Sequence, residues 1–143
     1  LGKTDVLVMD HVWLAIEYYL PPGQLVNDQN TTKGVAVRIP AGAASSVIDC
    51  PGDIKLFPGS YTAYLRIRPT SASGRAAMVT VSEDNSIIGT SEISGSVLTP
   101  GSYHVVPVAF AYSGGDLRIS VTGGTADSYL DYLFIRSNCY SGA

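Results

Sequence analysis

The stretch of sequence that decides the fold occurs twice. Residues 58–68 read PGSYTAYLRIR and residues 100–110 read PGSYHVVPVAF. Proline followed by glycine predicts a tight turn, because proline presets φ and glycine accepts positive φ. After the first turn, side chains alternate with a period of two, which predicts a strand with one buried and one solvated face. The expected buried side chains are Tyr61, Ala63, Leu65 and Ile67, and the expected solvated ones are Thr62, Tyr64, Arg66 and Arg68.

The second copy of this motif is less regular than the first. Pro107 cannot donate a hydrogen bond to a neighbouring strand, so it predicts an edge strand or a bulge. Tyr103 opens this strand as Tyr61 opens the first, and both rings are expected to fill the core.

The rest of the chain carries further strand patterns between turn residues. The expected strands are 6–9, 12–20, 35–39, 47–49, 54–57, 76–81, 86–89, 117–121 and 129–136. Residues 12–20 could also form a short helix, and Pro51-Gly52 predicts a turn between two strands. Short strands at this spacing predict one domain, residues 1–143, with the all-β fold of an antiparallel β-sandwich of the jelly-roll type.

The composition limits the classes of function. The chain has 143 residues, of which 45% are hydrophobic and only 15% charged, so it can bury one core beneath small polar groups. The net charge is −3 and no basic cluster is longer than residues 66–68, which argues against nucleic-acid binding. No apolar run reaches the length of a membrane helix. These features favour an extracellular or surface-exposed domain.

Two cysteines, Cys50 and Cys139, leave the redox state open. A disulfide between them would close a loop of about ninety residues and stabilise the fold by roughly 4–5 kcal/mol in chain-entropy models. It would also indicate an oxidising compartment, whereas two unpaired thiols would leave the compartment open. Because the chain begins at Leu1 and not at a methionine, we expect a processed product or a module of a larger protein.

Catalytic motifs are absent from the sequence. His11 and His104 do not form a metal-ligand pattern, and there is no nucleophile elbow, phosphate-binding loop or redox cysteine pair. Paired carboxylates for glycoside hydrolysis depend on spatial separation, so the sequence leaves them open. The acidic candidates lie in expected turns and loops: Glu83, Asp84, Asp5, Asp49 and Asp53. An enzyme is therefore the least favoured class.

Aromatic residues support a binding function better. Nine tyrosines and one tryptophan offer flat apolar faces with a polar group, which suits the C–H faces and hydroxyls of sugars, although aromatic residues also fill cores. The candidates that are free of the repeated strand starts are Tyr18, Tyr19, Tyr64, Tyr112, Tyr129 and Trp13.

Three segments then carry a family resemblance. Residues 57–68 (FPGSYTAYLRIR), 116–121 (DLRISV) and 129–135 (YLDYLFI) resemble, in this order, the strand motifs of carbohydrate-binding modules of the family 6 and family 35 type. The resemblance spans roughly residues 12 to 136. It implies a jelly-roll fold and non-catalytic binding of a polysaccharide.

The resemblance also implies site residues. Such modules often hold a structural calcium between an acidic residue of the first strand and the aspartate of the closing strand, here Glu17 and Asp131. The family usually has a second glutamate at the place of Ala15, and other oxygens would have to complete the calcium shell. If the sugar binds at the loop tip, as the resemblance implies, the expected ligand-binding residues are Tyr129, Asp127, Ser128 and Tyr18.

These observations favour one function over two others. The favoured function is a carbohydrate-binding module that holds a polysaccharide or glycan with an aromatic ring and polar loop groups. The first alternative is a structural or adhesive β-sandwich of a viral, phage or cell-surface assembly, and the second is a small glycan-active enzyme.

Overall fold

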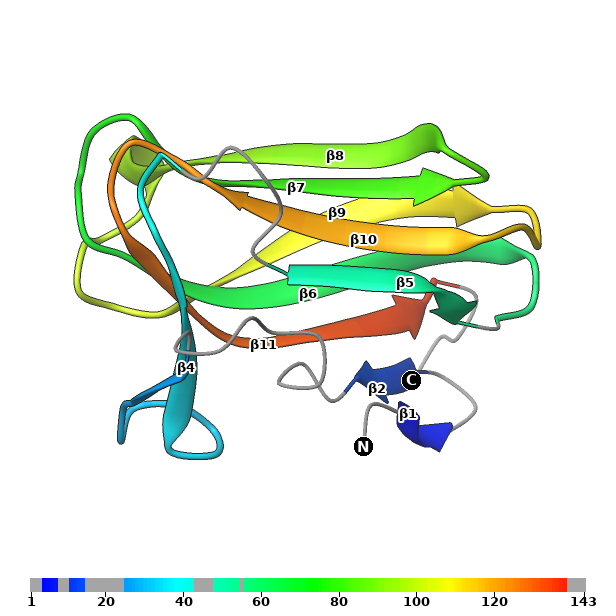
Figure 1. The fold of residues 1–143 in the computed structure, drawn as a ribbon, viewed down its shortest axis with the longest axis horizontal. Helices are drawn as coiled ribbons and strands as arrows, with labels where there is room; N and C mark the ends of the chain where they lie inside the picture. Colours follow the sequence, from blue (N-terminus) through cyan, green and yellow to red (C-terminus); the bar gives the residue numbers. More distant parts are fainter. Residues whose placement is uncertain (1–3, 8–10, 15–24, 43–47, 55, 139–143) are drawn as a thin grey trace.

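The computed structural model describes residues 4–7, 11–14, 25–42, 48–54 and 56–138. In this part of the chain, two antiparallel β-sheets pack face to face, as the sequence predicts (Figure 1). The elements are β1 (Thr4–Leu7), β2 (His11–Leu14), β3 (Leu25–Asn27), β4 (Val35–Ile39), β5 (Ile48–Ile54), β6 (Gly59–Pro69), β7 (Arg75–Glu83), β8 (Ser86–Ser94), the 3₁₀ turn η2 (Gly95–Val97), β9 (His104–Tyr112), β10 (Leu117–Gly123) and β11 (Ser128–Ser137). No helix among these residues is long and apolar enough to cross a membrane.

The two sheets differ in size. The four-stranded sheet has the order β5-β10-β7-β8. In the seven-stranded sheet, β6 lies between β9 and β11, and the other side of β11 pairs with β4 near its start and with β2 near its end. Strand β11 is therefore the element that joins the described N-terminal strands to the body of the sandwich.

The alternation predicted for residues 61–68 is confirmed in β6. The side chains of Ala63, Leu65 and Ile67 are fully buried, and Tyr64, Arg66 and Arg68 are partly exposed. Thr62, which was expected to be solvated, is buried, and its hydroxyl bonds to Asn138 at 2.8 Å. The opposing sheet contributes fully buried residues of β7 and β10, namely Ala77, Val79, Val81, Leu117, Ile119 and Val121. The burial of these apolar side chains between the sheets is the main source of stability.

The two repeated tyrosines lie in different surroundings. Tyr61 packs against the core and stacks on Phe110 at 5.9 Å between ring centroids, as expected. Tyr103 does not fill the core. It lies half-buried just before β9, and its hydroxyl donates a hydrogen bond to Asp28 at 2.7 Å. The shared tetrapeptide therefore predicts two strand starts but not the role of its tyrosine.

Two prolines were expected to interrupt strands, with different outcomes. Among the described residues β9 pairs within its sheet only with β6, so Pro107 lies in an edge strand, as predicted. The turn expected at Pro51-Gly52 is wrong, because β5 continues through it. Residues 50 and 54 of β5 face residues 119 and 117 of β10, so the extra residues form a bulge.

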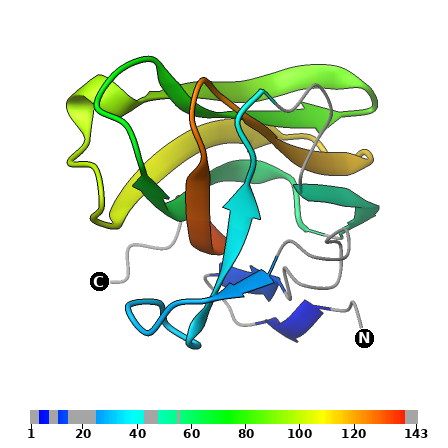
Figure 2. The same ribbon diagram turned by 60° about the vertical axis from the view of Figure 1, so that its left-hand side comes forward.

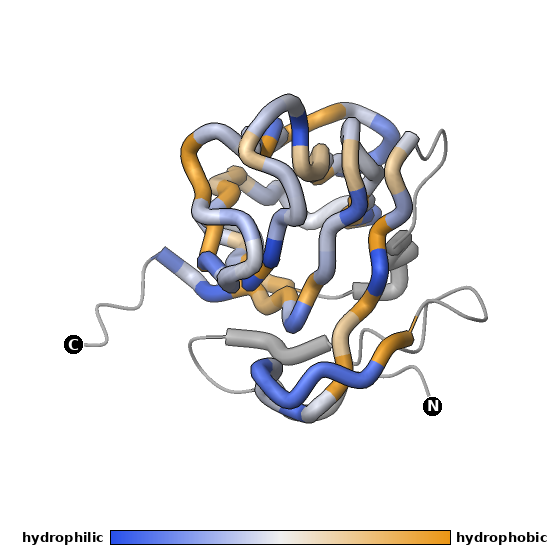
Figure 3. Tube along the Cα trace, turned by 90° about the vertical axis from the view of Figure 1, so that its left-hand side faces the viewer, coloured by the Kyte–Doolittle hydropathy of each residue, from blue (hydrophilic) through white to orange (hydrophobic). Residues whose placement is uncertain are grey.

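Strands β3 and β4 form a hairpin beside the start of β11 (Figure 2). The loop between them, residues 28–34, is mostly hydrophilic (Figure 3). It is closed by a hydrogen bond from the Asp28 N–H to the Gly34 carbonyl at 2.9 Å. Gly34 has a φ of +79°, which a residue with a side chain rarely adopts, so glycine suits this closure.

Candidate functional site

Charged and aromatic side chains gather on the outer face of the seven-stranded sheet, where β6 ends and β11 begins. They come from β4, β6, β11, the loop 28–34, the β10–β11 connection and the turn before β9. We call them the arginine–tyrosine patch, which consists of Arg38, Arg66, Arg68, Tyr103, Tyr129, Asp28, Asp127 and Asp131.

Strand register places Tyr129 at the centre of this patch. Tyr129 of β11 pairs with Arg38 of β4 on one side and with Arg68 of β6 on the other. Cross-strand partners point to the same face of a sheet, so all three side chains face outward. The Arg68 Cζ lies 4.2 Å from the centroid of the Tyr129 ring, a distance at which a guanidinium is attracted to the π face.

Tyr103 is the second aromatic ring of the patch. The Cζ atoms of Arg66 and Arg68 lie 4.6 and 5.6 Å from its centroid. Burial and the hydrogen bond to Asp28 raise the pKa of Tyr103 to about 12. The same hydrogen bond is the main reason why the pKa of the Asp28 carboxyl is lowered.

Each arginine of the patch has a carboxylate partner. The Arg66–Asp131 pair is the shortest, at 2.7 Å, followed by Arg38–Asp127 at 3.1 Å. The Arg68–Asp28 pair is the longest, at 3.4 Å. The backbone N–H of Ala41 and the Arg38 guanidinium lower the pKa of the Asp127 carboxyl. The patch is therefore rich in charged hydrogen-bonding groups without an excess of either sign.

A bulge in β11 decides where Asp131 points. Leu130 pairs with Ile67 and Tyr132 with Arg66, so Asp131 is an extra residue between them. Its side chain is only 2% exposed. The carboxylate accepts hydrogen bonds from the Thr32 N–H at 3.0 Å, the Thr32 hydroxyl at 3.0 Å and Arg66 Nη1 at 2.7 Å. Asp131 thus fastens the loop 28–34 to the sheet.

The sequence-predicted ligand residues lie in three different situations. Tyr129 is in the patch, and Asp127 is at its edge. Ser128 is fully buried, and its hydroxyl donates to the Ala76 carbonyl at 2.8 Å. Tyr18 lies outside the described residues.

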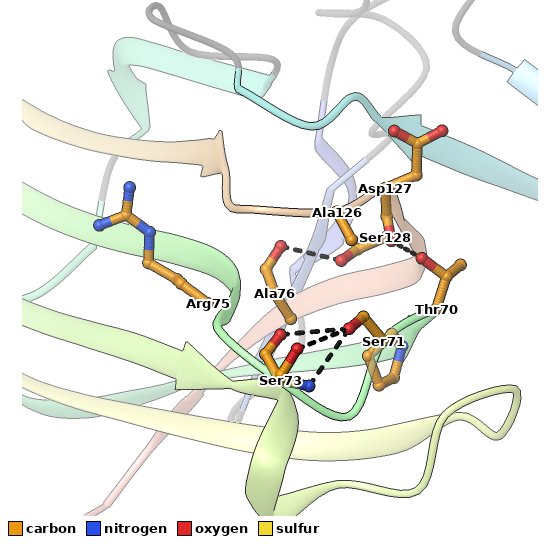
Figure 4. Close-up of a pocket in the computed structure, with 9 residues that line it drawn as sticks. Thr70, Ser71, Ser73, Arg75, Ala76, Ala126, Asp127 and Ser128 are labelled. Carbon is orange, nitrogen blue, oxygen red and sulfur yellow. Dashed lines mark hydrogen bonds between the residues drawn. The ribbon is translucent and has the colours of Figure 1, made fainter.

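A shallow depression lies between the β6–β7 and β10–β11 loops, beside Asp127 (Figure 4). Its polar walls include Ser71 and Ser73, and the Thr70 hydroxyl donates to the Asp127 carbonyl at 2.6 Å.

The expected calcium fits the described residues poorly. Asp131 already contacts the Arg66 guanidinium, whose positive charge would repel a second cation. No group of three or more histidine, cysteine, aspartate or glutamate side chains in the described part of the chain could hold a metal ion. Glu17 lies outside that part, so calcium at Glu17 and Asp131 stays a prediction. The disulfide also stays a prediction, because Cys139 lies outside it and only the backbone of Cys50 is described.

Carboxylates at the opposite end of the sandwich have a structural arrangement. The buried Glu83 accepts hydrogen bonds from the Ser113 and Gly115 N–H groups at 2.9 and 2.7 Å. Asp84 accepts one from the Asp116 N–H at 2.9 Å. These bonds hold the β9–β10 loop against the β7–β8 turn, so both carboxylates serve to position loops.

The sequence reasoning missed part of the patch. The alternation in β6 predicted that Arg66 and Arg68 face outward, which is the only signal that could have located them. Asp28 and Tyr103 are 75 residues apart in sequence, so no local pattern connects them. No sequence pattern marks Arg38 either.

Comparisons with known proteins bear on the fold. No protein-family model and no curated protein matches the sequence. A family 6 carbohydrate-binding module from Cellvibrio mixtus lichenase 5A, solved with cellotriose, superposes with a TM-score of 0.59 at 15% identity, over 92% of this chain and 99% of that one. The C-terminal family 6 module of a Zobellia galactanivorans laminarinase gives 0.57 at 12% identity, over 85% and 95%.

A larger protein contains the same architecture. A two-module fragment of a Clostridium thermocellum endo-1,4-β-D-xylanase, solved with xylohexaose, gives a TM-score of 0.53 at 13% identity over 80% of this chain. The chain spans about a quarter (24%) of that xylanase fragment. These likenesses show that the chain has the β-sandwich fold of carbohydrate-binding modules.

Proposed function

We propose that this protein is a non-catalytic carbohydrate-binding module whose ligand contacts the arginine–tyrosine patch. The observation that carries the proposal is the position of Tyr129, a partly exposed ring between two arginines and beside Asp127. An aromatic ring among charged hydrogen-bonding groups suits a sugar, whose C–H faces are apolar and whose rim carries hydroxyls. The fold of the superposed modules supports the same function.

The charges of the patch favour a neutral glycan over an acidic one. Because each arginine is paired with a carboxylate, the patch offers both donors and acceptors but no net attraction for an anion. Binding that rests on such groups depends only weakly on ionic strength, whereas binding of a uronic-acid polymer would weaken as salt screens the charges.

The proposed setting is outside the cell, as part of a larger protein. The low content of charged residues supports this setting, and the expected Cys50–Cys139 disulfide would require it. The xylanase fragment shows a sandwich of this fold joined to a second module.

A panel of neutral and acidic polysaccharides tests the function. Wild-type protein is expected to bind a neutral glycan, and Tyr129→Ala is expected to weaken that binding about tenfold or more, because the ring surface is lost. Tyr64→Ala is the matched control, since Tyr64 lies on the same sheet face but stacks on Phe134, 5.1 Å away, outside the patch. Melting curves of both variants show whether each is folded.

Two outcomes would contradict the proposal. If folded wild-type protein binds no polysaccharide of the panel, the binding function is wrong and the structural or adhesive alternative is favoured. Equal losses in the two variants would leave binding but remove Tyr129 as its site.

A further inference from the structure

Arg66 lies where three separate segments of the chain meet. Its Nη1 donates to Asp131 of β11 at 2.7 Å and to the backbone carbonyl of Asn30 at 3.1 Å. Its Cζ lies 4.6 Å from the centroid of the Tyr103 ring. One guanidinium thus contacts β11, the loop 28–34 and the turn that leads into β9.

The oxygen atoms around Arg66 are of the kind that a divalent cation would use. Carboxylate and backbone carbonyl oxygens are typical calcium ligands. The Asp131 side chain is only 2% exposed, so its carboxylate needs a nearby positive charge. The guanidinium supplies that charge, and the Tyr103 ring adds a cation–π contact that a hydrated metal ion would not make at this position.

We propose that Arg66 is a built-in cation that takes the place of a structural metal ion between β11 and the loop 28–34. The loop bonds both to this cation and to its carboxylate partner. Thr32 donates to the same Asp131 carboxylate through its N–H and its hydroxyl, and Asn30 accepts from the guanidinium. The order of this loop, and of the patch beneath it, therefore does not depend on calcium.

Calcium and a chelator provide the first test. Wild-type protein is melted in about 5 mM calcium and, separately, in excess EGTA, because an ion that binds only the folded state raises the midpoint. We expect the two midpoints to agree. A higher midpoint in calcium that is lost in EGTA would overturn the proposal and restore a metal site at Asp131.

Substitution of the arginine provides the second test. Arg66→Met leaves the Asp131 carboxylate without its cation, so the midpoint is expected to fall by about 4 °C or more. Amide exchange of Thr32, which donates to that carboxylate, is expected to speed up with it. Arg75→Met is the matched control, because Arg75 pairs with Glu92 at 3.5 Å on an exposed surface, and neither readout should change.

If Arg66→Met matches Arg75→Met in both midpoint and Thr32 exchange, Arg66 does not hold the loop and the proposal is wrong. If Arg66→Met does not fold, Arg66→Lys replaces it in the test, because lysine retains a positive charge. Amide exchange of Thr32 is then measured in that variant. Neither readout involves a sugar, so the proposed function can fail without affecting this inference.

Discussion

At the scale of single residues, Tyr103 links the stability of the patch to pH. Its pKa is raised from 10.0 to about 12 in the folded state, so folded protein holds the phenolic proton more tightly than unfolded protein does. The resulting stabilisation is fully present below the unfolded pKa and is lost as the pH rises through the folded one.

Replacing Tyr103 with phenylalanine tests this link. Tyr103→Phe is expected to be less stable than wild type near neutral pH, because the hydrogen bond to Asp28 is lost. The difference should shrink between about pH 10 and about pH 12, where only the wild type loses the contribution of this proton. Urea unfolding across that range measures it, and a difference that stays constant would contradict the assigned pKa.

Residue identity alone predicted the patch only in part. The alternation in β6 was enough to place Arg66 and Arg68 on the outer face, because outward direction is a local property of a strand. Their partners are not local. Asp131 points into the patch only because a bulge adds it between Leu130 and Tyr132, and no pattern in that strand marks the bulge.

At the scale of elements, regular strands were predicted well and irregular ones were not. Strands β6, β7 and β10 alternate over most of their length, so their sequences define both their existence and their buried face. The Pro51-Gly52 sequence is compatible with both a turn and a bulge. Only the pairing of β5 with β10 distinguishes the two. Tertiary pairing thus supplied the part that local sequence lacked.

The β10–β11 connection depends on a close approach of two backbones. A side chain at Gly124 would collide with the backbone of Arg75, whose carbonyl also accepts a hydrogen bond from the Thr125 N–H at 2.8 Å. Gly124→Ala is therefore expected to destabilise the protein by about 1–3 kcal/mol in urea unfolding. Gly101→Ala is the control, because nothing lies within 4 Å of its added Cβ and only its φ of +84° is strained. A smaller loss for Gly124→Ala than for Gly101→Ala would show that the loop simply moves away.

At the scale of the whole molecule, the two sheets share a single core. The buried cluster draws on β4, β6, β7, β8, β9, β10 and β11, so neither sheet has an interior of its own. The patch is built on the outer face of β6 and β11, whose inner faces contribute to this core. Rigid strands beneath the patch hold its side chains in place, which is how such a scaffold would favour binding without a deep cleft.

A shared core predicts that the sandwich unfolds as one unit. Leu65→Ala in the seven-stranded sheet and Leu117→Ala in the four-stranded sheet each remove a fully buried side chain, so each should cost about 2–5 kcal/mol. Because both side chains belong to the same cluster, each variant should lower one common transition without splitting it. Urea unfolding followed by tyrosine fluorescence and by far-ultraviolet circular dichroism measures this, and the two signals should coincide in both variants. Separate transitions in either variant would mean that one sheet survives without the other, and the patch would then depend on the seven-stranded sheet alone.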